Sequence, residues 1–286
     1  MTLSEIRSIP AIDIHAHCGN WNMPERERVE QQAGMPGELS LLLKNSAFAS
    51  TAITVVSHLG TLFPIGKGDS RFNEVCLSEL ADEPRVLMLC ALNPLDPGSY
   101  RQAERLLREP KCIGIKLHPA VHGYEIRACG DEIYSFAARL HAPIITHSGE
   151  KNCMPEDFAC LADRYPEVIT VVSHLGCGWD GDTEHQIRAV SHCRNGNLYT
   201  DTSSWHSMEM NLLERAVSAI GADKILYGTD SACYFSPSQR ARIDCSGISD
   251  LEKEQILFQN ALRLFPRIRG FYDAGCKALA DDAASI

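Results

Sequence analysis

The chain has 286 residues, 44% of them hydrophobic and 22% charged, a composition typical of a globular protein with a large core. Its formal net charge is −10 and no cluster of lysine and arginine stands out, so we expect neither nucleic acid nor a membrane surface as a partner. No segment approaches the roughly 20 apolar residues of a membrane span, and the first residues lack the layout of a signal peptide. The twelve cysteines are scattered singly, so we expect reduced thiols in a cytoplasmic protein.

Short runs rich in β-branched residues predict eight strands, at residues 11–17, 52–57, 86–91, 113–118, 144–147, 169–174, 198–202 and 225–230. Helical patterns lie between and after them, at residues 72–81, 100–108, 131–141, 155–165, 184–194, 208–220 and 250–264. Alternating strands and helices predict a single (β/α)8 TIM-barrel domain over residues 1–286, with a frayed tail at 278–286. A doubly wound open sheet is the alternative, because periodicity alone does not distinguish it from a barrel.

Polar residues gather at the carboxyl ends of these predicted strands. The first strand reads AIDIHAH, and because side chains two residues apart point the same way, Asp13, His15 and His17 are expected on one face. By the same rule, Lys116 and His118 share a face of the fourth strand. The fifth, sixth and eighth strands each end in one polar residue: His147, His174 and Asp230.

In a barrel, the carboxyl ends of all the strands converge in one mouth. A buried and unpaired imidazole, ammonium or carboxylate costs several kcal/mol, and a bound cation removes that cost. Histidines and an aspartate around an open position are typical of catalytic zinc sites. The pattern therefore predicts a site for zinc or a similar divalent ion.

The hexapeptide VVSHLG occurs twice, at residues 55–60 and 171–176. His174, in the second copy, ends the sixth strand and faces the shared mouth. His58, in the first copy, ends the second strand, where no neighbouring residue supplies a partner ligand. We therefore expect His58 to be a rim histidine that bonds a loop carbonyl or touches substrate, so that only one copy takes part in the chemistry.

The motifs IDIHAH, GIKLHP, ITHSG, VVSHLG, YTDTS, LYGTD and NALRLF, in this order from Ile12 to Phe265, resemble the amidohydrolase superfamily. They are most similar to its single-domain branch, which includes aminocarboxymuconate-semialdehyde decarboxylase and resorcylate decarboxylase relatives. The resemblance implies a barrel with one catalytic divalent metal, usually zinc, and makes a homodimer an expectation. It assigns catalysis to His174 and a supporting position to Asp13. It places the metal ligands at His15, His17, His147 and Asp230.

Lys116 occupies the position where binuclear members of the superfamily use a carboxylated lysine to bridge two metals. A free ammonium that binds a substrate carboxylate or pairs with Asp230 is the favoured interpretation, because an amine is the default state. One metal ion is then expected, and two if Lys116 is carboxylated. We expect no β-sandwich of the kind that flanks the barrel in larger amidohydrolases.

The predicted activity is hydrolysis of an amide, ester or lactone bond in a small anionic substrate. The metal would activate a water molecule, Asp230 would move its proton, His174 would donate to the oxygen where charge develops, and Lys116 would hold an anionic group. The same residues suit the alternative, metal-dependent decarboxylation of a cyclic or aromatic acid. An inactive metal-binding barrel, a nuclease of the TatD kind and a metal-free lactonase are further alternatives.

Loop residues are the expected source of substrate specificity. Aromatic side chains there could sandwich a flat molecule, although loop tryptophans are as often packed over a barrel rim. We expect Lys116, His118, Trp21 and Trp205 to bind substrate, with Trp179, His206 and Tyr234 as further candidates in the same loops.

Overall fold

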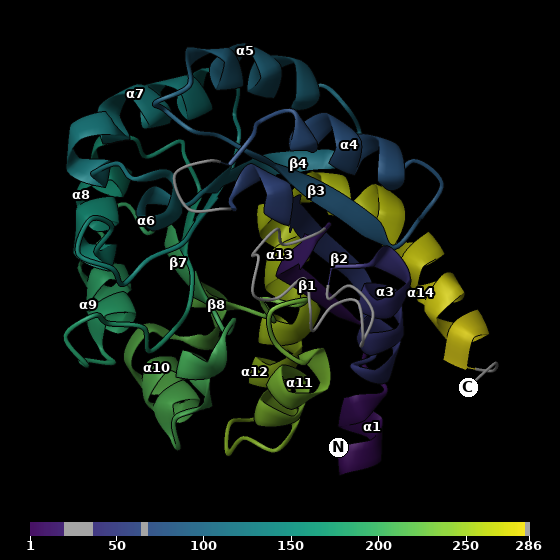
Figure 1. Cartoon of the computed structure of the whole chain (residues 1–286). Coiled ribbons are helices and arrows are strands. Elements are labelled where there is room, and N and C mark those ends of the chain that lie inside the picture. Colours follow the sequence, from purple (N-terminus) through teal and green to yellow (C-terminus); the bar gives the residue numbers. More distant parts are fainter. Residues whose placement is uncertain (20–36, 64–67, 284–286) are drawn as a thin grey trace, which may run out of the picture.

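A computed structural model describes residues 1–19, 37–63 and 68–283 of the chain. Eight parallel strands follow one another around a single sheet in chain order, with helices arranged around them (Figure 1). The strands are β1 (Ala11–Cys18), β2 (Thr51–His58), β3 (Val86–Ala91), β4 (Cys112–Leu117), β5 (Ile144–Thr146), β6 (Thr170–Val172), β7 (Leu198–Asp201) and β8 (Ile225–Leu226).

Backbone hydrogen bonds join the last strand segment to the first. The N–H of Ile14 donates to the carbonyl of Tyr227 at 3.0 Å, and the N–H of Asp230 donates to the carbonyl of His15 at 2.7 Å. Ala16 and Ser231 form a parallel bridge just above. The sheet is therefore a nearly closed barrel, which confirms the predicted (β/α)8 fold and excludes the doubly wound alternative.

The helices after the first four strands are α3 (Leu39–Phe48), α4 (Phe72–Glu79), α5 (Pro97–Leu106), and the pair α6 (Pro119–His122) and α7 (Ile126–Arg139). The next three strands are followed by α8 (Pro155–Arg164), α9 (His185–His192) and α10 (Leu212–Ile220). After β8 come α11 (Ser236–Asp244), α12 (Asp250–Glu254), a π-helical turn (Gln255–Gln259), α13 (Asn260–Leu264) and α14 (Arg269–Ala283). A short helix, α1 (Leu3–Arg7), precedes the barrel. None of the described helices is both long enough and apolar enough to cross a membrane.

The prediction of a frayed tail is wrong for residues 278–283, which continue α14, while residues 284–286 lie outside the described part of the chain. Helix α14 packs against β2, and Leu279 near its end is buried. Gly275 permits the close approach, because a Cβ atom there would lie 2.6 Å from the carbonyl oxygen of Ala52. Helices α1, α3, α6, α11 and α14 were not predicted.

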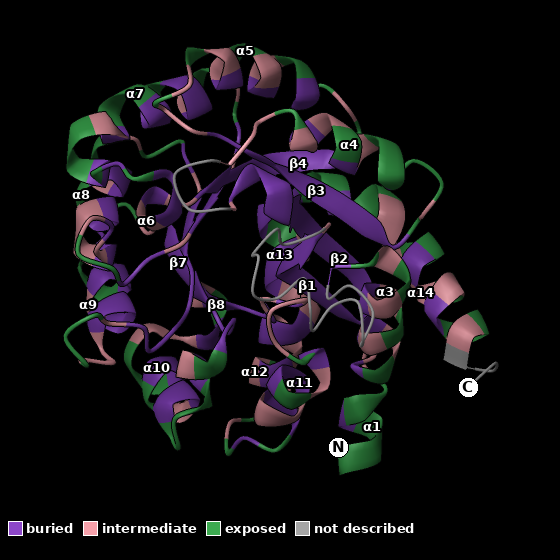
Figure 2. Ribbon diagram, in the orientation of Figure 1, coloured by how far each residue is buried: buried purple, intermediate pink, exposed green. Residues whose placement is uncertain are grey.

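The strands are buried on both faces, as the purple colour in Figure 2 shows. One apolar cluster includes Ile12, Ile14 and Val55 and is closed from below by Leu264 and Phe265. A second, larger cluster lies between the strands and the surrounding helices. The first cluster fills the interior of the barrel, and the polar residues gather at the carboxyl ends of the strands.

The alternation predicted for β1 is interrupted by a bulge. Its pairing with β2 changes register between Asp13 and Ala16, so Ile14 and His15 together face a single residue of β2. Ile14 accordingly belongs to the same cluster as Ile12, whereas Ala16 belongs to the larger cluster between the strands and the surrounding helices. The expectation that Asp13 shares a face with His15 and His17 is thus wrong, because the extra residue moves Asp13 to the opposite face.

Candidate active site

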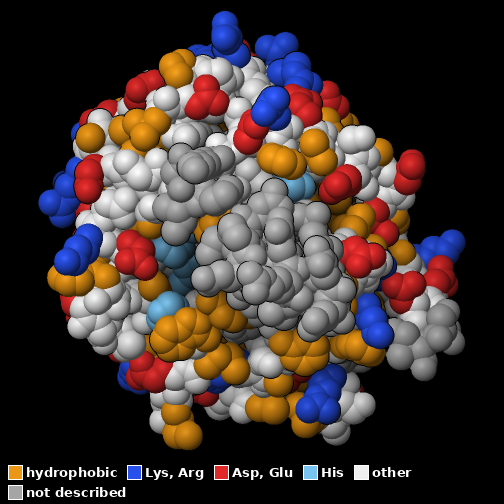
Figure 3. Space-filling view, viewed as in Figure 1, with side chains coloured by type: hydrophobic (Ala, Val, Ile, Leu, Met, Phe, Trp, Pro, Cys, Tyr) orange, Lys and Arg blue, Asp and Glu red, His pale blue; other side chains and the backbone are white. Residues whose placement is uncertain are grey.

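A cavity of about 160 Å³ lies at the carboxyl ends of the strands. In the space-filling view, histidine side chains are visible in the hollow beside hydrophobic ones (Figure 3). The lining combines polar residues from five strand ends with apolar and aromatic residues from the loops. It comprises His15, His17, Leu62, Phe63, Lys116, His118, His147, His174, Ser204, His206, Asp230, Cys233 and Tyr234.

His15, His17 and Asp230 form the centre of the site. The Nε2 atom of His17 lies 2.9 Å from Asp230 Oδ1, and the Nε2 atom of His15 lies 3.6 Å from the same oxygen. One candidate ligand atom from each residue therefore falls within 4.8 Å of the other two. The structure brings together three of the four predicted metal ligands.

The electrostatics of this group suit a divalent cation. Burial, reinforced by the nearby Lys116 ammonium, lowers the pKa of His15, so its imidazole is neutral and keeps a lone pair. Burial opposes the charge on Asp230, but the hydrogen bond from His17 and the interactions with the His174 and His15 imidazoles outweigh it and hold the Asp230 pKa below its usual range. Neutral imidazoles and an ionised carboxylate are the donors that zinc and manganese accept, so these residues fit such an ion.

Lys116 reaches the same centre from β4. Its Nζ atom lies 2.6 Å from His15 Nε2, and the side chain is buried. Burial lowers the pKa of Lys116 to about 8, although the carboxylates of Asp230 and Asp201 partly oppose this change. Of the two roles expected for the ammonium, the ion pair with Asp230 does not form, and Nζ contacts His15. Binding of a substrate carboxylate stays a prediction.

His147 lies beside this centre rather than within it. Its ring stacks on His118 with centroids 4.1 Å apart, and its Nδ1 atom lies 3.0 Å from His174 Nε2. Burial lowers the pKa of His118 and of His147 well below the ordinary value, and it lowers the pKa of His174 to about 4. All three line the pocket, but coordination of a metal by His147 stays a prediction.

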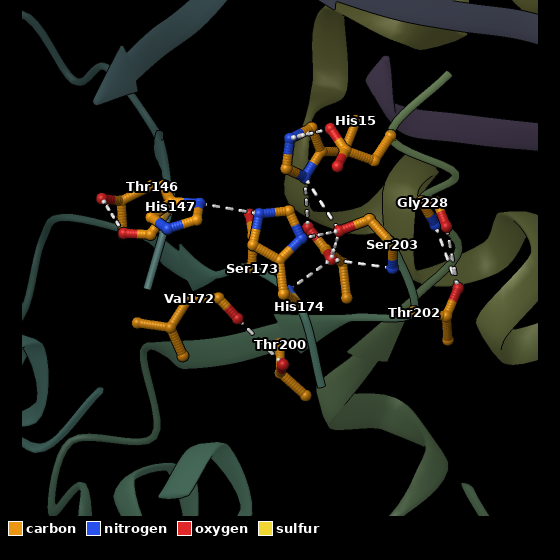
Figure 4. Close-up of polar contacts among 12 residues, drawn as sticks. His15, Thr146, His147, Val172, Ser173, His174, Thr200, Thr202, Ser203 and Gly228 are labelled. Atoms are coloured by element: carbon orange, nitrogen blue, oxygen red, sulfur yellow. Dashed lines mark hydrogen bonds and ion pairs between the residues drawn. The ribbon is translucent and has the colours of Figure 1, made fainter. Parts of the chain in front are cut away.

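Asp201 at the end of β7 and Ser203 just after it belong to the site, and the sequence analysis missed both. Asp201 Oδ2 lies 3.0 Å from His15 Nδ1, while Oδ1 accepts the backbone N–H groups of His174 and Ser203, each at 3.0 Å. The Ser203 hydroxyl also donates to Asp201 Oδ1 and lies 2.7 Å from His174 Nδ1 (Figure 4). An acid ending a barrel strand in YTDTS was the available signal.

His15, His174 and Asp201 also bring candidate ligand atoms within 4.8 Å of one another. Both Asp201 oxygens accept hydrogen bonds, and Asp201 is not among the residues that line the pocket. Burial opposes the charge on Asp201, but the partners His15, His174 and Ser203 outweigh it and lower the Asp201 pKa. The group that contains Asp230, whose three members all line the pocket, is therefore the candidate cation site.

The two VVSHLG copies contribute differently. His174 of the second copy lines the pocket, as predicted, whereas His58 is not among the lining residues. His58 is buried, stacks on Phe72 with centroids 4.8 Å apart and accepts the backbone N–H of Gly60 at Nδ1. The first copy nevertheless reaches the site through Ser57, whose hydroxyl lies 3.0 Å from His17 Nδ1.

Asp13 and the loop residues lie around this core. Asp13 accepts hydrogen bonds from the backbone N–H groups of His15 and Thr229, which fits its predicted supporting position. Trp205 is 62% exposed and stacks on His206, and of the two only His206 lines the pocket. Binding of substrate by Trp205 stays a prediction, and Trp21 lies outside the described residues.

Residues 12–267 match the amidohydrolase family. No curated protein matches the sequence. Similar solved structures include 2,6-dihydroxybenzoate decarboxylase from Rhizobium, with 16% identity, a TM-score of 0.69 and coverage of 90% of this chain and 98% of that chain. Another is 5-carboxyvanillate decarboxylase from Novosphingobium aromaticivorans complexed with manganese, with 14% identity, a TM-score of 0.68 and coverage of 91% and 97%. A third is dihydroxybenzoic acid decarboxylase from a Polaromonas species with bound manganese, with 16% identity, a TM-score of 0.69 and coverage of 90% and 97%.

At these identities the solved structures show a shared fold. The family match spans most of the chain and includes every residue of the site described above. This protein therefore belongs to the amidohydrolase family of enzymes.

Proposed function

We propose that this protein is a divalent-metal-dependent decarboxylase of a small aromatic acid. The observation that carries the proposal is one ring-sized pocket that joins a cation-binding group to aromatic walls. A cavity of about 150 Å³ is large enough for benzene, and this one measures about 160 Å³. The similar decarboxylases of aromatic acids favour this activity over hydrolysis, which the sequence analysis had placed first.

Manganese and zinc are both candidates for the metal. The donor set of His15, His17 and Asp230 suits either ion, and two of the similar decarboxylases contain manganese. With Lys116 as a free amine, one ion per chain is expected. When bound, the ion would polarise the substrate carboxylate and an adjacent hydroxyl as a Lewis acid.

The residues of this chain would divide the remaining work. The Lys116 ammonium would hold the carboxylate through charge, and the stacked rings of His118 and His147 would form a wall for the flat substrate. Asp230 is ionised and lines the pocket, so it could accept the proton of the substrate hydroxyl. When the bond between the ring carbon and the carboxylate carbon breaks, carbon dioxide leaves and the electron pair of that bond stays on the ring carbon. Asp230 would return the proton there, which completes the exchange of CO2 for hydrogen.

The test is a panel of hydroxybenzoic acids labelled with ¹³C in the carboxyl group, incubated with the purified protein after loading with manganese or zinc. We expect labelled CO2 and the matching phenol, lost on chelation and restored by metal. A parallel panel of lactones, esters and amides serves as the comparison. Metal-dependent hydrolysis without CO2 release would return the protein to the hydrolase class.

A further inference from the structure

A continuous path of polar contacts runs across the site, from the end of β5 to the end of β7. His147 Nδ1 lies 3.0 Å from His174 Nε2, and His174 Nδ1 lies 2.7 Å from the Ser203 hydroxyl. That hydroxyl contacts Asp201 Oδ1, while the other carboxylate oxygen, Oδ2, lies 3.0 Å from His15 Nδ1. Figure 4 shows the histidines and Ser203 facing one another along this path.

The direction of every hydrogen bond in the path follows from Asp201. An ionised carboxylate only accepts, so the single proton of the Ser203 hydroxyl goes to Asp201 Oδ1. Ser203 must then accept from His174, which places a proton on His174 Nδ1. In a neutral imidazole one nitrogen donates and the other accepts, so His174 Nε2 accepts from His147 Nδ1. By the same rule, His15 donates through Nδ1 to Asp201 Oδ2.

We propose that Asp201 is a positioning residue that fixes which ring nitrogen carries the proton in three histidines of the site. It holds His15 directly, and it holds His174 and then His147 through the Ser203 hydroxyl. The His15 and His147 rings are thereby left with an unprotonated Nε2, the form that binds a cation, and in His15 this nitrogen also lies 2.6 Å from Lys116 Nζ. One carboxylate on β7 thus prepares candidate ligands on both β1 and β5.

His17 provides an internal comparison because its Nδ1 atom contacts Ser57 rather than Asp201. Asp201 also accepts the backbone N–H of His174, whose φ angle of 69° lies in the left-handed region. The carboxylate therefore holds both the backbone and the ring of His174. Asp201 acts through other residues and is not among those that line the pocket.

The test uses the full-length protein labelled with ¹⁵N in its histidine rings, before and after addition of zinc. Long-range ¹H–¹⁵N spectra distinguish the two tautomers, and histidine substitutions assign the signals. Ser203→Ala removes the bridge together with a 3.1 Å contact to His15 Nδ1, a nitrogen that keeps its hydrogen bond to Asp201 Oδ2. Asp201→Asn removes the anionic acceptor. Thr200→Val is the matched control, since Thr200 is a buried β7 residue whose hydroxyl donates to the carbonyl of Val172 outside the path. Circular dichroism checks that each variant folds.

We expect the Nδ1-protonated tautomer for His15, His174 and His147 in the wild type. Ser203→Ala should change His174 and His147 but leave His15. Asp201→Asn should change His174 and His147 and leave His17, and it should change His15 once Lys116→Met removes the ammonium that contacts His15 Nε2. Zinc affinity, measured against a competing chelator, should fall about 10- to 100-fold in Asp201→Asn and stay unchanged in Thr200→Val.

A wild-type His174 protonated at Nε2, or unchanged tautomers in Ser203→Ala, would overturn the proposal. If the Asp201→Asn variant does not fold, the spectra of Ser203→Ala are sufficient to test the proposal. The inference rests on the proposed metal site, but the spectra need no turnover. Predicted tautomers in a protein that releases no CO2 would refute the proposed decarboxylation and leave the role of Asp201 standing.

Discussion

Asp230 and His174 share a backbone conformation that non-glycine residues seldom adopt. Their φ angles are 58° and 69°, in the left-handed region, where a side chain costs about 1 kcal/mol or more. Each backbone N–H is held by a hydrogen bond, to the carbonyl of His15 for Asp230 and to the Asp201 carboxylate for His174. Both residues lie in the segment that follows a strand, β6 for His174 and β8 for Asp230, and both line the pocket.

Asp230→Asn tests the central carboxylate. The amide keeps the size of the side chain but loses the charge that binds a cation and the basicity that moves a proton. We expect kcat to fall by about 10³-fold or more, with the fold retained and the bound metal reduced in elemental analysis. Asp131→Asn, at an exposed ion pair with Arg164, is the control and should keep full activity. Normal kcat in Asp230→Asn would exclude the assigned role.

Lys116→Met separates binding from folding. Methionine fills a similar volume without the charge, so we expect KM for an anionic substrate to rise about tenfold. Because a buried ammonium is costly, the free energy of unfolding should stay constant or rise by about 1 kcal/mol. Steady-state kinetics and urea unfolding measure the two effects. A large loss of stability with normal KM would contradict the assignment.

At the scale of elements, the close packing of α14 against β2 depends on one glycine, Gly275. In Gly275→Ala the new methyl group would meet the Ala52 carbonyl, so we expect a loss of about 1–3 kcal/mol in the free energy of unfolding. Gly270→Ala is the matched control in the same helix, because its Cβ atom meets nothing within 4 Å. It should be neutral or stabilising by up to about 1 kcal/mol. Equal effects in urea unfolding would refute the packing argument.

Helices α10 and α11 are joined by Glu214 and Arg242, whose closest hydrogen bond is 2.7 Å long. The hydrogen bond from Arg242 lowers the Glu214 pKa from 4.5 to about 2. A folded-state pKa below the unfolded value means that the pair stabilises the protein above about pH 4.5 and loses its effect as the pH falls toward 2.

We therefore expect Glu214→Gln to destabilise the protein by about 1–2 kcal/mol at pH 7 and progressively less in acid. Urea unfolding as a function of pH measures the difference from the wild type. Glu167→Gln, at an exposed position, should show no effect at either pH. A difference that persists at low pH would mean that the amide disturbs packing rather than removing a charge.

At the scale of the whole molecule, a cation that binds residues from both β1 and the segment after β8 should stabilise the closed barrel. At 100 times its dissociation constant, a ligand of the folded state contributes about 2.7 kcal/mol. For a chain of this size we expect zinc or manganese to raise Tm by about 5–10 °C, with reversal by a chelator. Differential scanning calorimetry measures the shift, and Asp230→Asn should respond far less. An unchanged wild-type Tm would argue against the site.

The sequence predicted the barrel because each strand is a compact apolar run that ends in a polar residue. Helix α14 was missed because its sequence, with two glycines, has low helix propensity. Its stability comes instead from packing against β2. The pairing of Asp201 with His15 was missed because the partners are 186 residues apart, and an aspartate after a strand equally suits a turn. The bulge in β1 leaves no trace in a period-two pattern.

That bulge has a consequence for protein engineering. Copying the letters AIDIHAH into a regular strand of another barrel would turn the first acid inward beside the two imidazoles, where this protein has Ile14. The transplanted centre would carry an additional negative charge and lose part of its hydrophobic floor. A designer who wants the same chemistry must therefore reproduce the irregular backbone as well as the residues.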